Sequence, residues 1–479
     1  TSQIKYIDQI TNGSNVPATD IDAKAVTFDT KTGATATLTE NFAIENKIVH
    51  KIDDGALGFV SVKLNEDFVT PLSFTPATLT PKVQRGVNAA SAGYIVNVAN
   101  GTYNEDLDVN KALTVDGEST AAILRGLNVA GNSVTMSASS STLKDVKVTR
   151  DFGVTLADWY AAAKNQGVTI GNSTTGVTLD NVWITGNRNG LYINNAQGFT
   201  VQNCQIEDNR TGIQLVNDVS TGQIKNNFIR NNFTHGVLYN VFGGTTLIGT
   251  GHKLNNNDIS GNWYAQLSLH QNGGTIGDLT GFDNNCNWYG TLNPNYAAIA
   301  AGEPGYASQV PTQHGGTDPG INADIRGTKA NLLTYIPFTT DGTDITPLVA
   351  GFQPTLGTCT GLGPVVNVTK NLTYPTIQIA INDANASGDL ITVPAGTFNE
   401  NVNITKPLTL QGVNNALAGC AGGRAAESII DGGGGTAVKI SANGVTVIGF
   451  QLDGRTGVSA AGFTDIIVKN NKVFAQIMG

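Results

Sequence analysis

A repeat in the middle of the chain constrains the fold more than any other feature. The stretch "DNVWI" at residues 180–184 is followed by "QNCQI" 22 residues later, by "KNNFI" after 23 more, and by "NNNDI" after a further 30. Each copy alternates a few apolar residues with polar ones and is bounded by turn-forming residues. A period of this length is typical of a solenoid, in which each repeat is one coil stacked on the last. The sequence therefore predicts an all-β parallel β-helix.

Identical residues recur at equivalent positions of the copies. The three columns are Asn181, Asn203, Asn226 and Asn256; Asn187, Asn209, Asn232 and Asn262; and Ile184, Ile206, Ile229 and Ile259. In coils about 4.8 Å apart such residues stack directly, and an Asn amide donates to one neighbouring coil while accepting from the other. We expect both Asn columns to form structural ladders. A Gly column at Gly190, Gly212 and Gly236 is expected to mark a bend with positive φ, with a strand after each glycine.

A longer repeat relates Gly101–Gly117 to Gly396–Gly412 at an offset of 295 residues. Each copy follows a segment with helical spacing, "VQRGVNAASAG" or "IQIAINDANASG", which would cover the first coil of a β-helix. The predicted organisation is one complete unit and the start of a second. Its parts are a β-rich N-terminal segment or cap at 1–80, with strand-like "AVTFDT", "TATLT" and "GFVSVKL", a first unit at 81–294, a Gly/Pro/Thr-rich linker at 295–371, and the start of a second unit at 372–479.

The opening "YPTIQIAINDANASGDLITVPAGTFNENVNITKPLTLQG" resembles the start of right-handed parallel β-helix proteins of the pectin-lyase-like superfamily. The stretch "NNCNWYGTLNP" at 284–294 resembles the end of β-helix units in large secreted bacterial surface proteins. The resemblance implies a right-handed β-helix and an extracellular or cell-surface location. It implies no particular activity, because this superfamily contains lyases, hydrolases, epimerases, adhesins and purely structural proteins.

Composition excludes several functional classes. The 28 Lys and Arg against 37 Asp and Glu give a net charge of -9 without a basic run, so nucleic-acid binding is not expected. No stretch approaches the ~18 apolar residues of a membrane helix. The four Cys lack C-x-x-C spacing, and no cofactor or metal is expected. Cys204 and Cys286 occupy apolar repeat positions and are predicted to be buried thiols, whereas Cys359 and Cys420 lie in Gly-rich segments and are candidates for a disulfide.

A catalytic site of the kind found in this superfamily would require acids at equivalent positions of neighbouring coils. Enzymes of the superfamily bring carboxylates of neighbouring coils together on one face, with Arg or Lys nearby. In the aligned coils no column holds two acids, and Asp218 is the only acid in the segments after the glycines. The family's catalytic pattern does not map onto this chain, so no catalytic residue is assigned.

Four side chains are weak candidates for ligand binding. Arg188 and Arg210 share a column and would contact an anionic sugar, or else pack their stems on the coil below. Trp183 and Phe228 point outward by alternation and would stack on a sugar ring, or else pack beneath the N-terminal segment or the linker. The histidines of these coils, His235, His252 and His270, fall in different columns and are expected at the surface.

The sequence favours a non-catalytic extracellular structural or adhesive protein that belongs to a multi-unit surface or filament assembly. The alternative is a polysaccharide lyase or hydrolase acting on an acidic polysaccharide, and a carbohydrate-binding module without catalysis is a third hypothesis. The expected partners are carbohydrate or other copies of the chain. The segment "VKNNKVFAQIMG" at 468–479 repeats the coil pattern without a capping segment, which predicts self-association or continuation in a longer chain.

Overall fold

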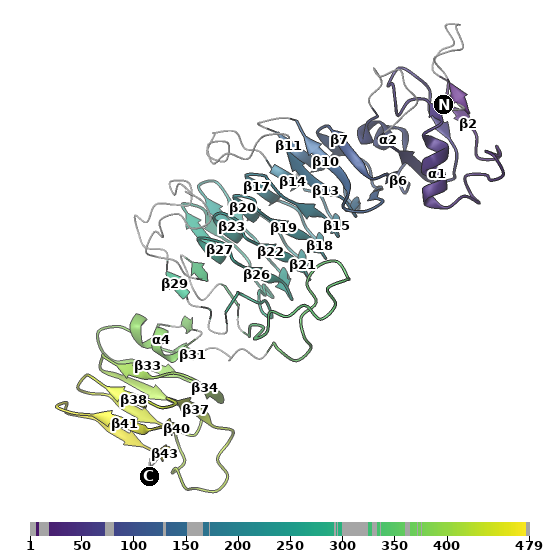
Figure 1. Ribbon diagram of the computed structural model, residues 1–479. Coiled ribbons are helices and arrows are strands. Elements are labelled where there is room, and N and C mark those ends of the chain that lie inside the picture. The colour runs from purple at the N-terminus through teal and green to yellow at the C-terminus, as the bar shows by residue number, and fades with distance from the viewer. Residues whose placement is uncertain are drawn as a thin grey trace. The chain divides into compact units, whose positions relative to one another are not determined.

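The computed structural model describes residues 6–8, 19–71, 81–127, 131–150, 166–171, 173–291, 294, 296–298, 324–327, 333–335, 337–359, 365–370, 372–374 and 376–475. The chain divides into two compact units (Figure 1). The first comprises 1–283, 302–322 and 343–354, and the second comprises 284–301, 323–342 and 355–479.

The first unit is a stack of coils, and each coil gives one strand to each of three sheets whose paired strands run parallel (Figure 1). Sheet A contains β8 (Leu107–Val109), β11 (Asn132–Met136), β14 (Gln166–Gly171), β17 (Asn189–Asn194), β20 (Thr211–Val216), β23 (His235–Phe242) and β27 (Ala265–Asn272). Sheet B contains β7 (Gly101–Asn104), β10 (Ala122–Gly126), β13 (Lys147–Arg150), β16 (Trp183–Ile184), β19 (Gln205–Glu207), β22 (Phe228–Arg230) and β26 (Asp258–Ser260). Sheet C contains β5 (Glu66–Val69), β6 (Ile95–Val98), β9 (Thr114–Gly117), β12 (Thr142–Lys144), β15 (Thr178–Asp180), β18 (Thr200–Gln202), β21 (Gln223–Lys225) and β25 (Lys253–Asn255).

The core lies inside the coils because alternate residues of each strand point inward. All four members of the isoleucine column are fully buried. On sheet A, Leu191, Ile213 and Val237 lie side by side in successive coils with no exposed surface. The predicted all-β parallel β-helix is confirmed, as are the strands expected after each glycine of the Gly column.

The second Asn column forms a buried ladder between sheets B and A. The Asn187 amide nitrogen lies 3.3 Å from Asn209 Oδ1, the Asn209 amide bonds Asn232 Oδ1 in the same way, and the Asn232 amide donates to Asn262 Oδ1 at 2.9 Å. Each Oδ1 also accepts the backbone N–H of the preceding Asn at 3.0 to 3.1 Å. Arg150 Nε donates to Asn187 Oδ1 at one end, and Asn262 donates to Gln266 Oε1 at the other.

The Gly column has a different role from the predicted bend. Gly190, Gly212 and Gly236 lie within β17, β20 and β23, and their φ values are not positive. A Cβ built on Gly212 would lie 2.8 Å from the Asn232 amide nitrogen and 2.5 Å from the Gly236 carbonyl oxygen. Glycine is required there because the ladder amide of the next coil occupies the space of a side chain.

The first Asn column does not form the expected inward ladder. Its four members have φ between 52° and 59°, so each is a left-handed corner residue, and none is fully buried. The Asn203 amide donates instead to Asp180 Oδ1 at 2.7 Å. The next residue points inward: the Asn227 amide donates to Asn257 Oδ1 at 2.8 Å, and Asn227 Oδ1 accepts from the Cys204 N–H at the same distance. Cys204 is a buried thiol, as predicted.

The N-terminal region contains more helix than predicted. "TATLT" does not form a strand, because Thr37 caps α1 (Leu38–Glu45) in a capping box with Glu40. The remaining strands before β5 have two residues each, namely β1 (Ile7–Asp8), β2 (Ile21–Asp22), β3 (Ile48–Val49) and β4 (Val60–Ser61). The pair β24 (Thr246–Leu247) and β28 (Thr275–Ile276) is a further short sheet of the first unit.

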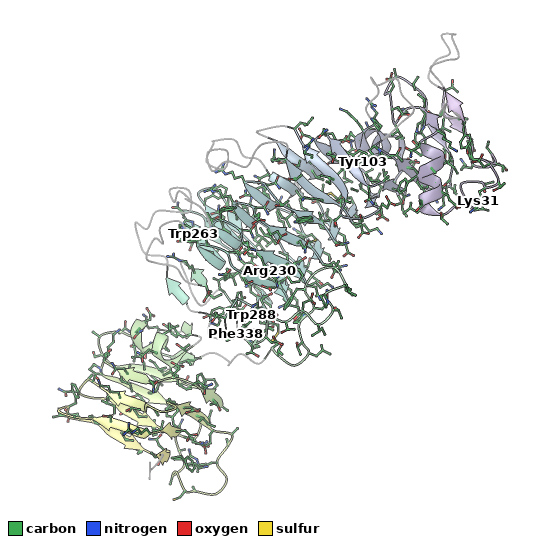
Figure 2. All side chains as sticks on the ribbon, viewed as in Figure 1. Lys31, Tyr103, Arg230, Trp263, Trp288 and Phe338 are labelled. Carbon is green, nitrogen blue, oxygen red and sulfur yellow. A yellow bond between two sulfur atoms is a disulfide. The ribbon has the colours of Figure 1, made fainter. Side chains whose placement is uncertain are left out.

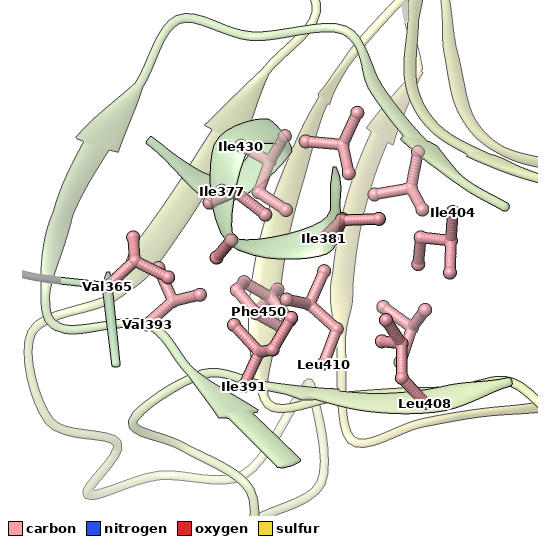
Figure 3. Close-up of a cluster of buried hydrophobic side chains, with 14 of the residues drawn as sticks. Val365, Ile377, Ile381, Ile391, Val393, Ile404, Leu408, Leu410, Ile430 and Phe450 are labelled. Carbon is pink, nitrogen blue, oxygen red and sulfur yellow. The ribbon is translucent and has the colours of Figure 1, made fainter. Parts of the chain in front are cut away.

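The second unit repeats the start of the first. The predicted helices before the two copies are confirmed as α2 (Val83–Ala89) and α4 (Ile377–Asp383). Its strands are β29 (Tyr296–Ala298), β30 (Ile325–Gly327), β31 (Val365–Asn367), β32 (Leu372–Tyr374), β33 (Asp389–Thr392), β34 (Gly396–Phe398), β35 (Val402–Ile404), β36 (Leu408–Gln411), β37 (Ser428–Asp431), β38 (Thr436–Ile440), β39 (Thr446–Ile448), β40 (Phe450–Gly454), β41 (Thr456–Ala460), β42 (Ile467–Lys469) and β43 (Lys472–Ala475). Figure 3 shows how Ile377 and Ile381 of α4 pack on Leu410 and Phe450 inside the coils.

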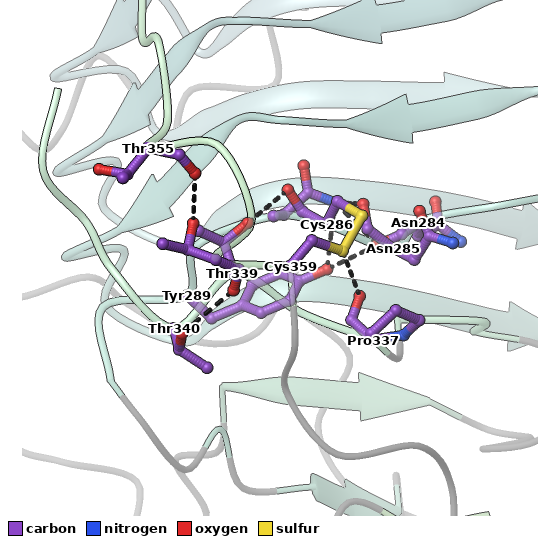
Figure 4. Close-up of a disulfide and its surroundings, with 11 residues drawn as sticks. Asn284, Asn285, Cys286, Tyr289, Pro337, Thr339, Thr340, Thr355 and Cys359 are labelled. Carbon is purple, nitrogen blue, oxygen red and sulfur yellow. Dashed lines mark hydrogen bonds between the residues drawn. A yellow bond between two sulfur atoms is a disulfide. The ribbon is translucent and has the colours of Figure 1, made fainter. Parts of the chain in front are cut away.

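The predicted Cys359–Cys420 disulfide is wrong. Cys359 is bonded to Cys286, and Cys420 is an exposed free thiol (Figure 4). The residues around the bond are held by backbone contacts: the Cys286 N–H donates to the Pro337 carbonyl at 2.6 Å, and Thr339 Oγ1 donates to the Cys286 carbonyl at 2.9 Å. Cys286 is therefore not the buried thiol that its repeat position suggested, because the chain returns to this coil after residue 333.

Candidate functional site

A pocket of about 280 Å³ lies on the outer face of sheet A. Its lining comes from four strands and from the corners that precede two of them. The lining residues are Gln166, Arg188, Asn189, Tyr192, Arg210, Gln214, Asn240 and Phe242. The strands bring them together in register, since Gln166 pairs with Asn189 and Tyr192 pairs with Gln214 in parallel ladders. None of the described residues that line this pocket is an acid.

The two arginines of the predicted column both face this pocket. Each arginine directly follows a ladder Asn, so the hydrogen bonds of the ladder fix the backbone from which the arginine side chain extends. Arg210 is nearly buried, at 3% exposure, and its backbone N–H donates to the Asn187 carbonyl at 3.0 Å. Arg188 is half-buried. Two cationic side chains in one column create a pocket that favours an anion.

Gln166 supplies a second indication of a ligand. It is 7% exposed and lines the pocket, yet its Oε1 has no hydrogen-bond partner. A buried acceptor without a donor is unfavourable by about 1 to 3 kcal/mol, and a ligand hydroxyl would satisfy it. The repeats did not predict Gln166 as a site residue. Its strand, β14, follows a longer segment than the other sheet A strands do and falls outside the aligned copies.

A second, more open pocket of about 470 Å³ lies at the other end of β17 and β20 and is lined by Asn194, Asn195, Asn217, Asp218, Thr246 and Ile248. Asp218 is engaged within the protein, since Gln197 Nε2 donates to its Oδ2 at 2.5 Å and Ser220 Oγ donates to its Oδ1 at 2.6 Å. The Asn217 amide donates to Asn194 Oδ1 at 2.7 Å. These polar groups bind one another, so this pocket is a weaker candidate than the first.

A carboxylate pair does exist, at the corner between sheets C and B. Asp116 and Asp145 share Lys144, whose Nζ lies 2.8 Å from an Asp116 oxygen and 3.7 Å from an Asp145 oxygen. Burial raises the pKa of Asp116, and Lys144 opposes the shift. The pair is diagonal, between coils that the repeat alignment did not compare. Neither acid lines either pocket of sheet A.

The two aromatic candidates lie on sheet B, away from the pocket lining. Lys147 Nζ is 3.5 Å from the centre of the Trp183 ring, so one face of that ring is already covered. The Phe228 ring packs against Phe352 at 5.7 Å, and the guanidinium of Arg230, labelled in Figure 2, lies 4.0 Å from its centre. For Phe228 the packing alternative holds, because Phe352 belongs to the predicted linker.

Two of the three histidines expected at the surface are buried. His235 is 1% exposed and His252 is fully buried, whereas His270 is half-buried. His252 Nε2 lies 2.9 Å from the Tyr239 hydroxyl, and burial lowers the pKa of His252 to about 3, so the ring is neutral. The two buried rings pack against aromatic side chains and serve the fold. Within the part of the chain that the structure describes, no group of three or more His, Cys, Asp or Glu is arranged to hold a metal ion.

Residues 112–285 match a protein family described as "Right handed beta helix region". This match agrees with the parallel sheets, which are built from one strand per coil. The chain thus has the fold of a parallel β-helix. A search with the sequence matched no curated protein. No described helix of this β-helix protein is long and apolar enough to cross a membrane.

Solved structures with the same kind of coil include enzymes that act on polysaccharides. A pectin methylesterase in complex with a hexasaccharide is 15% identical, with a TM-score of 0.28, over 42% of this chain and 65% of its own. The catalytic domain of a GH87 α-1,3-glucanase, in complex with tetrasaccharides, is 13% identical over 86% of this chain and 66% of its own, with a TM-score of 0.34. The A-module of a mannuronan C-5 epimerase from Azotobacter vinelandii is 11% identical over 82% and 95%, with a TM-score of 0.30. The chain thus spans less than two thirds of the pectin methylesterase and of the glucanase domain, and these likenesses carry no conclusion about activity.

Proposed function

We propose that this β-helix protein binds an acidic polysaccharide in the sheet A pocket and serves as an adhesive or structural protein outside the cell. The observation that carries the proposal is the convergence of Arg188 and Arg210 with an unpartnered buried acceptor, Gln166 Oε1, on one face of one sheet. A sugar acid presents both complementary groups, a carboxylate and neighbouring hydroxyls.

The chemistry of each lining group supports this ligand class. A guanidinium binds a carboxylate through two parallel N–H···O bonds, which Lys does not reproduce. The amides of Asn189, Gln214 and Asn240 offer donors and acceptors for hydroxyls. Tyr192 and Phe242 add apolar surface for the faces of a sugar ring. A polar pocket with a few aromatic groups suits a carbohydrate better than an apolar ligand.

A lyase acting on an acidic polysaccharide is the second candidate. The specific observation that favours it is Tyr192 beside two arginines in one pocket. Elimination from a uronic acid needs a cation to neutralise the carboxylate, a base to remove the adjacent proton and an acid for the leaving oxygen, and these residues supply the first and third roles. A hydrolase is less well supported because hydrolysis of glycosides uses two facing carboxyl groups, and the described residues of the pocket lining include none.

The experiment is a calorimetric titration of the whole protein with polygalacturonate, alginate and a neutral glucan. Binding to the two acidic polymers and not to the neutral one is expected. Arg188→Ala should weaken binding by about tenfold or more, since a hydrogen bond to a charged group contributes about 1.5 to 3 kcal/mol. Arg455→Ala, which removes an exposed arginine of the second unit, is the matched control and should bind as the wild type does.

The same samples distinguish the two candidates. Unsaturated sugar ends that accumulate with the wild type and disappear in Tyr192→Phe would establish the lyase in place of the binding protein. Equal affinity for acidic and neutral polymers, or no binding at all, would contradict both.

A further inference from the structure

A cluster of four titratable side chains lies buried in the N-terminal region, at residues 19–71, away from the sheet A pocket. Glu45 ends α1, His50 and Asp53 follow β3, and Asp67 lies in β5. Their exposures are 4%, 0%, 2% and 1%. Three acids and one histidine in the interior of so small a region are unusual, because burying a charge is costly unless it is paired.

The histidine pairs with one acid only. His50 Nε2 lies 2.6 Å from Glu45 Oε1, while His50 Nδ1 accepts the Val60 N–H at 3.0 Å. Because Nδ1 is an acceptor, the ring donates to Glu45 through Nε2. The His50 backbone N–H donates to Asp53 Oδ2 at 2.9 Å. The imidazole is therefore fully engaged with Glu45 and Val60.

Two carboxyl groups of the cluster remain unsatisfied. Both oxygens of Asp67, and Oδ1 of Asp53, are buried without a hydrogen-bond partner. Among the described residues, the groups of this region are not arranged to hold a metal ion. A bound proton is the remaining way to neutralise these carboxyls.

Few charged groups act on these two acids. Glu45, His50 and Lys111 influence the pKa of Asp67, and Glu45, His50 and Arg85 influence that of Asp53. The cations are engaged elsewhere: Arg85 Nη1 donates to the backbone carbonyls of Ile52, at 3.0 Å, and Asp53, and Lys111 Nζ donates to the carbonyls at the end of α2 at 2.6 to 2.9 Å. Burial is the largest effect, and it raises the pKa of Asp53 and of Asp67 to about 7.

The position of the cluster gives it a consequence for the β-helix. β5 pairs with β6, the next strand of sheet C, along all four of its residues, from Glu66–Ile95 to Val69–Val98. It covers the edge of the first coil, whose N–H and C=O groups would otherwise be available to other chains. Asp67 lies in the middle of that covering strand.

We propose that Asp53 and Asp67 form a pH-sensitive lock, which holds residues 19–71 on the first coil while both carboxyls are protonated and loosens this region when they ionise. The direction follows from proton linkage. In the unfolded region an Asp has a pKa of about 3.9, so the folded region binds more protons between about pH 4 and pH 7. The stability that these protons supply is complete below about pH 4 and is lost as the pH rises to about 7.

Hydrogen exchange of the whole protein at pH 5 and pH 8, corrected for the intrinsic effect of pH on exchange, tests the lock. The amides of β3, β4 and β5 should open more at pH 8, on the order of 100-fold more for each of the two carboxyls, because one such carboxyl changes the opening equilibrium about tenfold per pH unit below its folded pKa. The amides of β20 in sheet A should not change and serve as the internal reference. Asp67→Asn, which carries no charge at either pH, should reduce the difference by a factor on the order of 100.

Asp54→Asn is the matched control, because it removes one carboxylate from the same segment at a half-buried position and should leave the difference intact. Equal protection of β3 to β5 at pH 5 and pH 8 in the wild type would overturn the proposal, whether or not Asp67→Asn folds. Looser structure at pH 5 than at pH 8 would also overturn it, since carboxyl groups with a raised pKa stabilise the folded region at low pH. An unchanged pH difference in a folded Asp67→Asn variant would remove Asp67 from the lock.

Discussion

In both units a helix is held on the first coil by the same contacts, called here the shared device, and the two units then diverge. In the first, Glu105 accepts the backbone N–H groups of Val83 and Gln84 at 2.7 and 3.0 Å. In the second, Glu400 accepts those of Ile377 and Gln378 at 3.0 and 2.9 Å. A lysine binds the carbonyls at the far end of each helix, Lys111 on α2 and Lys406 on α4. The carboxylate lies at the positive end of the helix and the ammonium at the negative end.

What precedes and follows this device differs. β6 is covered by β5 in parallel, whereas the corresponding β33 is covered by β31 in antiparallel orientation. The four-membered Asn ladder and the arginine pocket belong to the first unit. The residues that dock a helix on the first coil therefore specify the start of a β-helix, while the coils that follow carry the candidate site.

Breaking the ladder should have the largest effect. Asn232→Leu keeps the volume but leaves the Asn209 backbone N–H without its acceptor and the Ile206 carbonyl without its amide donor. At about 1 to 3 kcal/mol for each buried unpaired group, the free energy of unfolding of the first unit should fall by about 2 to 6 kcal/mol. Denaturant unfolding measures this loss. Gln205→Leu, on the exposed face of sheet B, is the control and should change little; similar losses in the two variants would contradict a structural ladder.

Filling the space beside the ladder should have an intermediate effect. Gly212→Ala places a Cβ where the Asn232 amide and the Gly236 carbonyl already lie, and overpacking of this kind costs about 1 to 3 kcal/mol. Gly243→Ala adds the same methyl group where nothing lies within 4 Å. The difference between the two melting temperatures checks the expectation. A Gly212→Ala variant as stable as Gly243→Ala would show that the coil spacing adjusts freely.

Removing the contacts that Glu105 and Glu400 make should have an equal effect in both units. Glu105→Ala and Glu400→Ala each delete two charge-assisted bonds to a helix start, for an expected loss of about 2 kcal/mol. Hydrogen exchange of α2 and α4 amides reports each loss separately. Opening of one helix without comparable opening of the other would mean that the two starts are alike in sequence only.

Periodicity predicted the coils and the isoleucine column because both depend only on alternation and repeat length. It did not predict which of two adjacent corner residues points inward. The pairs Asn226-Asn227 and Asn470-Asn471 now provide that rule: the first residue is left-handed, and the second accepts a backbone N–H, that of Cys204 in one case and of Phe450 in the other. The capping box at Thr37 and Glu40 was a readable signal that the strand-like composition of "TATLT" concealed.

Other features depend on long-range geometry that a linear pattern does not contain. Cys286 meets Cys359 because the chain returns to the coil after 73 residues. The arginine column was found from the repeats, but Gln166, Asn240 and Phe242 join it from coils that lie outside the regular alignment or extend past it. The buried acids of the N-terminal region lie in a segment without any repeat, where only a folded structure shows their proximity.

The binding site is assigned to the coils that follow α2, and a hydrogen-exchange footprint of the whole protein with and without an oligogalacturonate tests this assignment most directly. Slower exchange is predicted at residues 186–192 and 208–214, around Arg188, Tyr192, Arg210 and Gln214, with no change at residues 376–475. Slower exchange confined to residues 376–475, or to the sheet B face around Trp183, would contradict it.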